Sequence, residues 1–305
     1  MNNEQLKEFR ALVDRFSVDD AVNETEIPGL VLFRSCQCTT GVPTMYDPAI
    51  GIIAAGQKDL WVDDHKYEYG PGKFILLSVD LPCVGKIENA TKDDPYLAMK
   101  LDIDRQVLSE LLVETGKTIS NSNSSSGRGV IIGDTSEKMG DAAIRLLKLL
   151  DEPEDIPSLA PGIIRELFYY LLRSEYGSCV SQIVLQDSHI QRIASAIQRI
   201  KTNLNKTIPV EELAETVGMS VSSFHAHFKS VTRMTPLQYQ KSLRLIKARN
   251  LMIANEMDAA STAYTVGYES PSQFSREYAR MFGNPPGRDI SLLKQQEGAI
   301  QQSAV

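Results

Sequence analysis

The stretch VGYESPSQFSREYARMFGNPP, residues 266–286, decides the fold of the C-terminal part of the chain. Ser270 is a suitable N-cap, because its hydroxyl can accept hydrogen bonds from the free amides of a first helical turn. Pro271 fits the first helical position, where its missing N–H costs nothing. Gly283 favours a helix end, and the proline pair 285–286 predicts that the helix does not resume. The stretch therefore predicts a turn, a capped helix and a stop.

The predicted helix has two different faces. Phe274, Tyr278 and Met281 share one helical stripe, which is typical of a side packed against a core. The opposite stripe carries side chains that form hydrogen bonds: Ser272, Gln273, Arg276 and Arg280. A short capped helix with aromatic residues inside and Ser, Gln and Arg outside is what reading of a DNA major groove requires.

The same motif occurs a second time, about 50 residues earlier in the chain. In both copies, residues spaced at i, i+3, i+4 and i+7 precede a glycine: Val210, Leu213, Ala214, Val217 and Gly218, then Ala259, Thr262, Ala263, Val266 and Gly267. A serine cap and two aromatic residues follow each glycine: Ser220, Phe224 and Phe228, then Ser270, Phe274 and Tyr278. An internal repeat of this kind predicts two helix-turn-helix units.

Residues 236–253, PLQYQKSLRLIKARNLMI, separate the two repeats. Their periodicity predicts a long amphipathic helix with a basic rim of Lys241, Arg244, Lys247 and Arg249. One rigid helix of this kind can hold two reading helices in successive major grooves, about 34 Å apart on one face of the DNA.

Residues 190–289 resemble the DNA-binding domain of the AraC/XylS family of bacterial transcription regulators. The resemblance is carried by LAETVGMSVSSFHAHFKSVTRMTPLQYQKSLRLIKARNLM and by VGYESPSQFSREYARMFG. It implies binding to double-stranded DNA and contact with RNA polymerase, and activation is the family's habit. One position departs from the family pattern. Ala226 stands in the first repeat at the position equivalent to Arg276, where the family often has a base-reading polar or basic side chain.

The facing of the two helices, together with this resemblance, predicts which side chains meet DNA. Base contacts are expected from Ser222, Ser223, His225, Ser272, Gln273 and Arg276. Phosphate contacts are expected from Lys229, Ser270 and Arg280. Because arginine can grip a guanine edge with two hydrogen bonds and alanine cannot, the second repeat should contribute more of the sequence specificity.

The net charge of −7 is unevenly distributed along the chain. Residues 187–290 carry 13 Lys and Arg against 9 Asp and Glu, a net charge of +4, which leaves −11 for the remainder. The acidic remainder masks a basic module, so the overall charge does not argue against DNA binding.

The N-terminal part has one helical stretch, residues 4–16, followed by a β pattern. Short β-like runs lie at residues 30–35, 50–55, 59–62, 66–69, 74–78 and 97–103. Asp63-Asp64 and Gly70-Pro71-Gly72 suit tight turns between them. Several short strands with regular turns predict a small antiparallel barrel or sandwich.

Three stretches of this region resemble the N-terminal cupin-like domain of one subgroup of AraC-type regulators: YDPAIGIIAAGQK, YEYGPGKFILLSVDLP and DPYLAMKLDID. The resemblance covers roughly residues 20–185 and implies a double-stranded β-barrel whose interior holds a small effector of unknown identity. Helical stretches follow at residues 138–150 and 161–173. Both can pack on the barrel, or the first can pair with its copy across a homodimer, as the family implies.

Nothing in the sequence predicts catalysis, a metal or a cofactor. A metal-dependent cupin needs several imidazoles and a carboxylate at one metal, and only His65 of the four histidines lies in the barrel, beside a turn where a solvated ring is expected. Cys36, Cys38, Cys83 and Cys179 are expected to be reduced, packed thiols. The alternative for the first three is that one of them senses an oxidant or an electrophile.

We therefore predict a cytoplasmic α+β transcription regulator and not an enzyme. A cupin-like β-barrel with flanking helices, residues 1–185, senses an effector and dimerises. An all-α domain, residues 187–290, binds DNA through two helix-turn-helix units joined by a long helix, and residues 291–305 form a disordered tail. No apolar run is long enough to span a membrane, and no export signal is present. The alternatives are a barrel that only dimerises and a cupin enzyme with a DNA-binding appendage.

Overall fold

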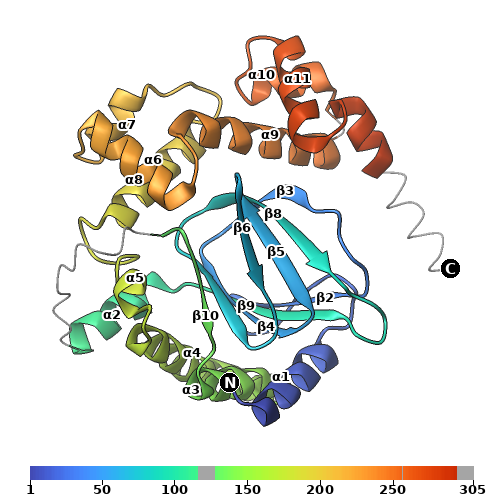
Figure 1. Cartoon of the computed structure of the whole chain (residues 1–305), viewed down its shortest axis with the longest axis vertical. Helices are drawn as coiled ribbons and strands as arrows, with labels where there is room; N and C mark the ends of the chain where they lie inside the picture. Colours follow the sequence, from blue (N-terminus) through green and yellow to red (C-terminus); the bar gives the residue numbers. More distant parts are fainter. Residues whose placement is uncertain (116–127, 256, 294–305) are drawn as a thin grey trace.

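The computed structural model describes residues 1–115, 128–255 and 257–293 (Figure 1). Its N-terminal part is rich in β-structure and its C-terminal part is helical, as predicted. Figure 1 shows the sheets in the middle, with α1 (Asn3–Phe16), α3 (Glu137–Lys148) and α4 (Ile156–Arg173) on one side and the C-terminal helices on the other. Every helix within the described residues is too short or too polar to cross a lipid bilayer.

The strands form two antiparallel sheets. The six-stranded sheet has the order β1 (Val22–Glu24), β2 (Leu30–Ser35), β9 (Tyr96–Asp102), β4 (Ala49–Ala55), β7 (Lys73–Leu77), β10 (Val130–Asp134). The four-stranded sheet has the order β3 (Val42–Tyr46), β8 (Leu81–Glu88), β5 (Gln57–Val62), β6 (His65–Tyr69). In the described residues the two sheets face each other as a sandwich and do not close into one hydrogen-bonded barrel. We call this unit the sandwich.

Side-chain alternation buries the six-stranded sheet on both faces. In β7, Phe74 and Leu76 point to the outer face and join the core formed with α1, α3 and α4. Ile75 and Leu77 point to the inner face, between the two sheets. The helices thus cover the outer face of this sheet, and its inner face lies against the four-stranded sheet.

Four strands escaped prediction: β1, β3, β8 and β10. Proline explains two of them, since it cannot donate to a sheet and lowers the strand signal. Pro43 lies in β3, and Pro82 in β8 stands opposite Met45. The predicted strands and the tight turn at Asp63, whose φ is 54°, are confirmed.

Two further differences concern helices of the N-terminal part. The helix α2 (Arg105–Thr115) was not predicted. The helix α4 was expected to open at Pro161, but it begins at Ile156 and contains that proline. Burial of Ile156 and Ala160 explains the longer helix, because the packing of these side chains offsets the missing backbone hydrogen bond.

The C-terminal helices confirm the two predicted helix-turn-helix units. A short α5 (Gly177–Ser181) and α6 (His189–Thr202) lead into the first unit, which is α7 (Val210–Thr216) and α8 (Val221–Thr232). The long α9 (Pro236–Asn255) connects it to the second unit, α10 (Ala259–Thr265) and α11 (Pro271–Phe282). Figure 1 shows α9 running between the two units and across one edge of the sandwich.

The proline pair 285–286 does not end the helical structure, which corrects one prediction. Residues 286–293 are helical, because Pro286 occupies a first-turn position where its missing N–H is not needed. The predicted disordered tail 291–305 therefore begins inside a helix, and from residue 294 onward it lies outside the described residues.

Candidate DNA-binding face and cavity

The helix α11 is capped and packed as its sequence predicts. The Ser270 hydroxyl accepts a hydrogen bond from the Gln273 amide at 3.4 Å, and Gly283 ends the helix at a left-handed φ of 81°. The rings of Phe274 and Tyr278 are fully buried. Their contact, with centroids 5.5 Å apart in an edge-to-face arrangement, fixes the rotation of the helix about its axis.

That rotation determines which residues of α11 face outward. Ser272, Gln273, Arg276 and Arg280 are all exposed, while the Ser270 side chain is half-buried in its capping role. Within the described residues, neither arginine forms a salt bridge. Both guanidinium groups are thus free for an anionic partner, and the face can form hydrogen bonds at several points.

The helix α8 has a similar outward face, but its side chains offer fewer hydrogen-bond donors. Its predicted contact residues Ser222, His225 and Lys229 are exposed, and Ser223 is half-buried. Ala226, in the position equivalent to Arg276, is also exposed and presents only a methyl group. The first unit therefore offers fewer hydrogen-bond donors to a base edge than the second.

The other histidine of α8 turns inward. His227 stacks on His189 with ring centroids 3.6 Å apart and an interplanar angle of 15°. Burial, together with the neighbouring His189 ring, lowers the pKa of His227 and favours its neutral form. His225 and His227 thus point in different directions, as expected for residues two apart on a helix.

Glu277 positions the candidate DNA-binding helix, and the sequence did not indicate this role. It lies on α11 among the outward-facing residues, yet it accepts hydrogen bonds from Lys241 at 2.9 Å and from the Tyr268 hydroxyl at 2.8 Å. Burial opposes its charge, but these bonds and one from Gln273 outweigh it and lower the pKa of Glu277. This carboxylate ties α11 to α9, and no local sequence pattern distinguishes it from a surface glutamate.

The predicted basic rim of α9 is wrong for two of its four residues. Arg244 is buried and donates through Nε to the Leu204 carbonyl at 2.7 Å. Arg249 forms a salt bridge with Asp289 at 2.8 Å, and its guanidinium lies over the Phe282 ring. Their charges therefore serve the packing of α9 and not a DNA surface. The sequence pattern did not indicate this, because the partners Leu204 and Asp289 lie 40 residues away.

The sandwich is joined to the C-terminal helices at Asp80. This buried carboxylate forms a salt bridge with Lys201 and accepts a hydrogen bond from Gln198 at 3.4 Å, both residues of α6. Its backbone carbonyl accepts from the buried Tyr239 hydroxyl of α9 at 2.9 Å. One residue of the sandwich therefore holds two helices of the other part.

Asp47 connects this junction to the space between the sheets. Burial raises the pKa of Asp47, and a side-chain hydrogen bond with Asp80 raises it further. Asp47 also lines a cavity enclosed by the sandwich. This hydrogen bond links the cavity wall to the domain junction.

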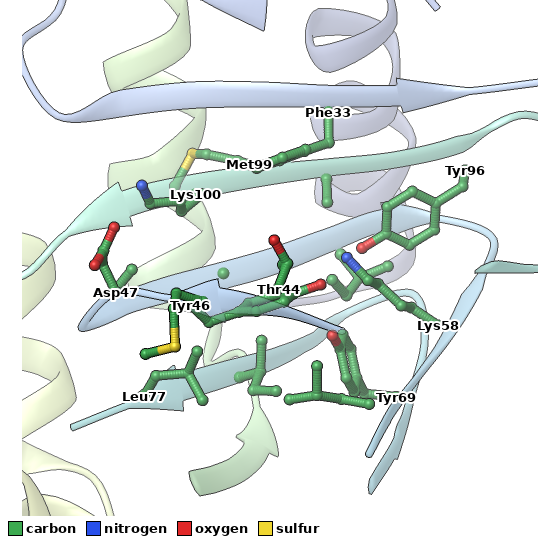
Figure 2. A pocket seen from close by; sticks show the side chains of 17 residues that line it. Phe33, Thr44, Tyr46, Asp47, Lys58, Tyr69, Leu77, Tyr96, Met99 and Lys100 are labelled. Carbon is green, nitrogen blue, oxygen red and sulfur yellow. The ribbon is translucent and has the colours of Figure 1, made fainter. Parts of the chain in front are cut away.

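The cavity has a volume of about 260 Å³ and lies between the two sheets. Its wall is largely apolar, with polar groups at its two ends. In Figure 2 the ends of Lys58, Tyr69 and Tyr96 point toward one another at one end, while Asp47 and Lys100 lie at the other. Further lining residues are Phe33, Thr44, Met45, Tyr46, Ala49, Gly51, Ile53, Leu60, Ile75, Leu77, Ala98 and Met99.

Lys58 is the unusual member of this wall, and the sequence prediction omitted it. Its Nζ lies 5.4 Å from the Tyr46 ring centroid, 5.7 Å from that of Tyr96 and 5.9 Å from that of Phe33. Burial lowers the pKa of Lys58 to about 8, so the amine is still mostly protonated at neutral pH. The sequence did indicate this burial: Lys58 precedes the buried Leu60 and Val62 by two and four residues, so its side chain points to the same face of β5.

The described residues contain no group of three or more His, Cys, Asp and Glu residues that can hold a metal. His65 is exposed, as predicted, and contacts Asp64 at 2.6 Å. Cys83 is fully buried, and burial raises the pKa of its thiol, which argues against a role for this cysteine in sensing oxidants.

Comparison with known proteins agrees with this architecture. The profile of the AraC-type transcriptional regulator N-terminus matches residues 26–179, and that of a helix-turn-helix domain matches residues 213–289. The transcriptional activator RhaS of Yersinia pestis is 26% identical over 140 residues. That match covers 46% of this chain and 48% of RhaS, so the chain spans about half the length of the curated relatives it matches.

Solved structures share the fold. A 1.65 Å structure of ToxT from Vibrio cholerae is 14% identical, covers 86% of this chain and 97% of its own, and has a TM-score of 0.56. Wild-type ToxT bound to an unsaturated fatty acid is 14% identical and covers 86% of this chain and 93% of its own, with a TM-score of 0.54. Because the N-terminal profile alone matches half of the sequence, the chain belongs to the AraC-type transcriptional regulators.

Proposed function

We propose that this protein activates transcription by binding a specific site in double-stranded DNA through α8 and α11. In this proposal Ser222, Ser223, His225, Ser272, Gln273 and Arg276 contact bases, and Lys229, Ser270 and Arg280 contact phosphates. Contact with RNA polymerase then recruits the enzyme to the promoter. The name of the RhaS relatives, transcriptional activators, supports activation over repression.

The observation that carries this proposal is the outward face of α11. Arg276 and Arg280 are exposed and have no salt-bridge partner among the described residues, whereas Lys241 and Arg249 of α9 are both paired with carboxylates. Arginine side chains left unpaired beside exposed Ser272 and Gln273 suit a polyanion that also presents hydrogen-bonding base edges.

We further propose that the sandwich receives a small-molecule effector in its cavity. A sandwich that only dimerised would have no need of open space between its sheets, and the cavity of about 260 Å³ favours the sensor. ToxT, which shares the fold, has been crystallised with an unsaturated fatty acid. Occupation of the cavity reaches DNA binding through Asp47 and Asp80, and it shifts the domain arrangement by its differential affinity for the two states.

The remaining parts of the proposal concern organisation. Residues 1–185 act as the sensing domain and residues 187–290 as the DNA-binding domain of a cytoplasmic regulator without enzymatic activity. The protein works as a homodimer. Since the apolar side of α3 is already buried against α1 and α4, the dimer contact must use another part of its surface. Light scattering of the full chain measures the oligomeric state.

Genome-wide mapping of bound DNA tests the proposed function. We expect discrete sites that share one sequence motif, and affinity for that motif that falls steeply with salt. About five phosphate contacts give a slope of log affinity against log salt near −4 to −5. Binding without a shared motif, or affinity that does not respond to salt, would rule out the proposed DNA contacts.

A further inference from the structure

Two lysines line the cavity, and they differ in how their charges are balanced. Lys100 forms a salt bridge with Asp102 at 2.8 Å and lies at the same end as Asp47. Lys58 lies at the opposite end and forms neither a salt bridge nor a hydrogen bond within the described part of the chain. The cavity therefore contains one ammonium group without a counter-charge.

The surroundings of Lys58 stabilise a cation only weakly. Three aromatic rings lie within 6 Å of its Nζ, and cation–π attraction of this kind contributes about 1–2 kcal/mol when the cation is desolvated. An unpaired buried charge costs considerably more than that. A ligand anion would supply the missing partner and would recover the cost of burying the ammonium group.

Hydrogen-bond donors converge beside this ammonium. A methyl group at Gly85 would collide with the Tyr46 hydroxyl and would approach Lys58 Cε to 2.8 Å and Nζ to 3.4 Å, so both side chains end above the same glycine. The Tyr96 hydroxyl points to the same end of the cavity (Figure 2). One ammonium and phenol hydroxyls can together hold the two oxygen atoms of a carboxylate.

The rest of the wall determines the body of the ligand. Ile53, Leu60, Ile75 and Leu77 line the cavity beyond the polar end and offer only apolar contacts. A single uncompensated positive charge matches one negative charge, whereas a phosphate ester carries nearly two. We propose that the effector is a monocarboxylic acid with a compact apolar body, whose carboxylate pairs with Lys58 and is held by Tyr46 and Tyr96.

This inference rests on the proposed effector function and can be tested separately from it. The probes are three molecules with one body and different charges: phenylbutyrate, its neutral amide and phenylbutylamine. A second set, octanoate, octanamide and octylamine, tests whether body shape limits binding. Calorimetry with the full-length protein measures the affinity of each, and a DNA-binding assay measures the response.

We expect the acids to bind at least about tenfold more tightly than the amides, and the amines to bind least, because a hydrogen bond to a charged group is worth more than one to a neutral group. Lys58→Met should abolish this preference and leave amide binding intact. Lys100→Met is the matched control, since it removes a lysine from the same wall that already has a partner, and it should keep the preference. Gly85→Ala should weaken binding of the acids by displacing Tyr46 and Lys58.

Results that contradict the ligand class differ from results that contradict the sensing function. Equal binding of acid and amide, a preference that survives Lys58→Met, or no binding by any probe overturns the ligand class. If the acids bind through Lys58 but leave DNA affinity unchanged, the ligand class stands and the sensing function fails. If amides alter DNA affinity as strongly as acids do, sensing stands and the carboxylate inference fails.

Discussion

The two helix-turn-helix units have the same sequence motif but different relations to the sandwich. Phe224, Phe228 and Tyr239 of the first unit and its neighbouring helix belong to a cluster that continues into Leu81 and Cys83 of β8. The second unit packs around a separate cluster that includes Phe274 and Tyr278 and draws on α9. The first unit is anchored to the sensor, and the second is attached mainly to the long helix.

The unit that is anchored to the sandwich has the fewer hydrogen-bonding side chains on its outward face. The anchored unit carries Ala226, and the separately packed unit carries Arg276 at the matching position. Under the proposed base contacts, a signal in the sandwich acts most directly on the unit with fewer of them. We infer that the second unit selects the site, while the sensor controls whether the first unit can join it on the DNA.

The largest expected effect comes from deleting a buried ring in each unit. Phe228→Ala and Phe274→Ala should each cost about 3–5 kcal/mol of stability. Hydrogen–deuterium exchange should show faster exchange in α10, α11 and the second half of α9 for Phe274→Ala. For Phe228→Ala it should extend into α6 and β8. Identical exchange patterns for the two variants would mean that the two cores are not separate.

The next comparison uses two buried carboxylates. Asp80→Asn weakens the tie between the sandwich and the first unit, and Asp289→Asn weakens the tie between α9 and the second unit. Loss of hydrogen bonds to a charged group should cost about 1.5–3 kcal/mol in each case.

Only Asp80→Asn should change how DNA binding responds to a bound ligand, which a gel-shift titration with and without ligand measures. A changed response in Asp289→Asn alone would place the route of coupling elsewhere.

The roles of the two exposed arginines can be separated on DNA. Arg276→Ala should lose about 1–3 kcal/mol of discrimination at one or two base pairs and barely change non-specific binding. Arg280→Ala should weaken all sequences alike. Selection from a randomised-site library measures both, and the reverse assignment would follow if Arg280→Ala relaxed one position while Arg276→Ala weakened binding uniformly.

The smallest effect is a pH dependence of stability. Burial lowers the pKa of Lys58 from 10.5 to about 8, so the unfolded chain binds more protons than the folded one between these values. Stability contributed by this group therefore rises with pH across that window and is lowest below it. Chemical denaturation at about pH 7 and about pH 9 should show a gain of about 1 kcal/mol in the wild type relative to Lys58→Met. A constant difference would mean that Lys58 is not desolvated.

Local patterns carried most of the fold prediction. Caps such as Ser270 and the aromatic spacing of Phe274 and Tyr278 act within one helix, so they can be read without a structure. Arg244 and Arg249 were misplaced on an exposed rim because their partners, Leu204 and Asp289, lie 40 residues away in the sequence. A helical wheel records the charge of a residue and not its tertiary partner.

The cavity was harder to predict than the reading helices. The predicted strand began at Asp59 and so left out Lys58, although the alternation with Leu60 was visible in the sequence. A lysine in phase with buried residues is normally assigned to a strand end, where its amine reaches water. The amine lies between Phe33 and Tyr96 of the six-stranded sheet and Tyr46 of the unpredicted β3, so its burial depends on both sheets.

The residue that precedes β10 lies against α8, and this contact has a genetic consequence. Gly129 lies so close to the Val231 carbonyl of α8 that a methyl group added there would overlap it. A single-nucleotide change to alanine would thus push the sensor away from the first unit without altering any residue expected to meet DNA or ligand. Gly129 is therefore a position at which selection for regulators with an altered response to their inducer should recover mutants.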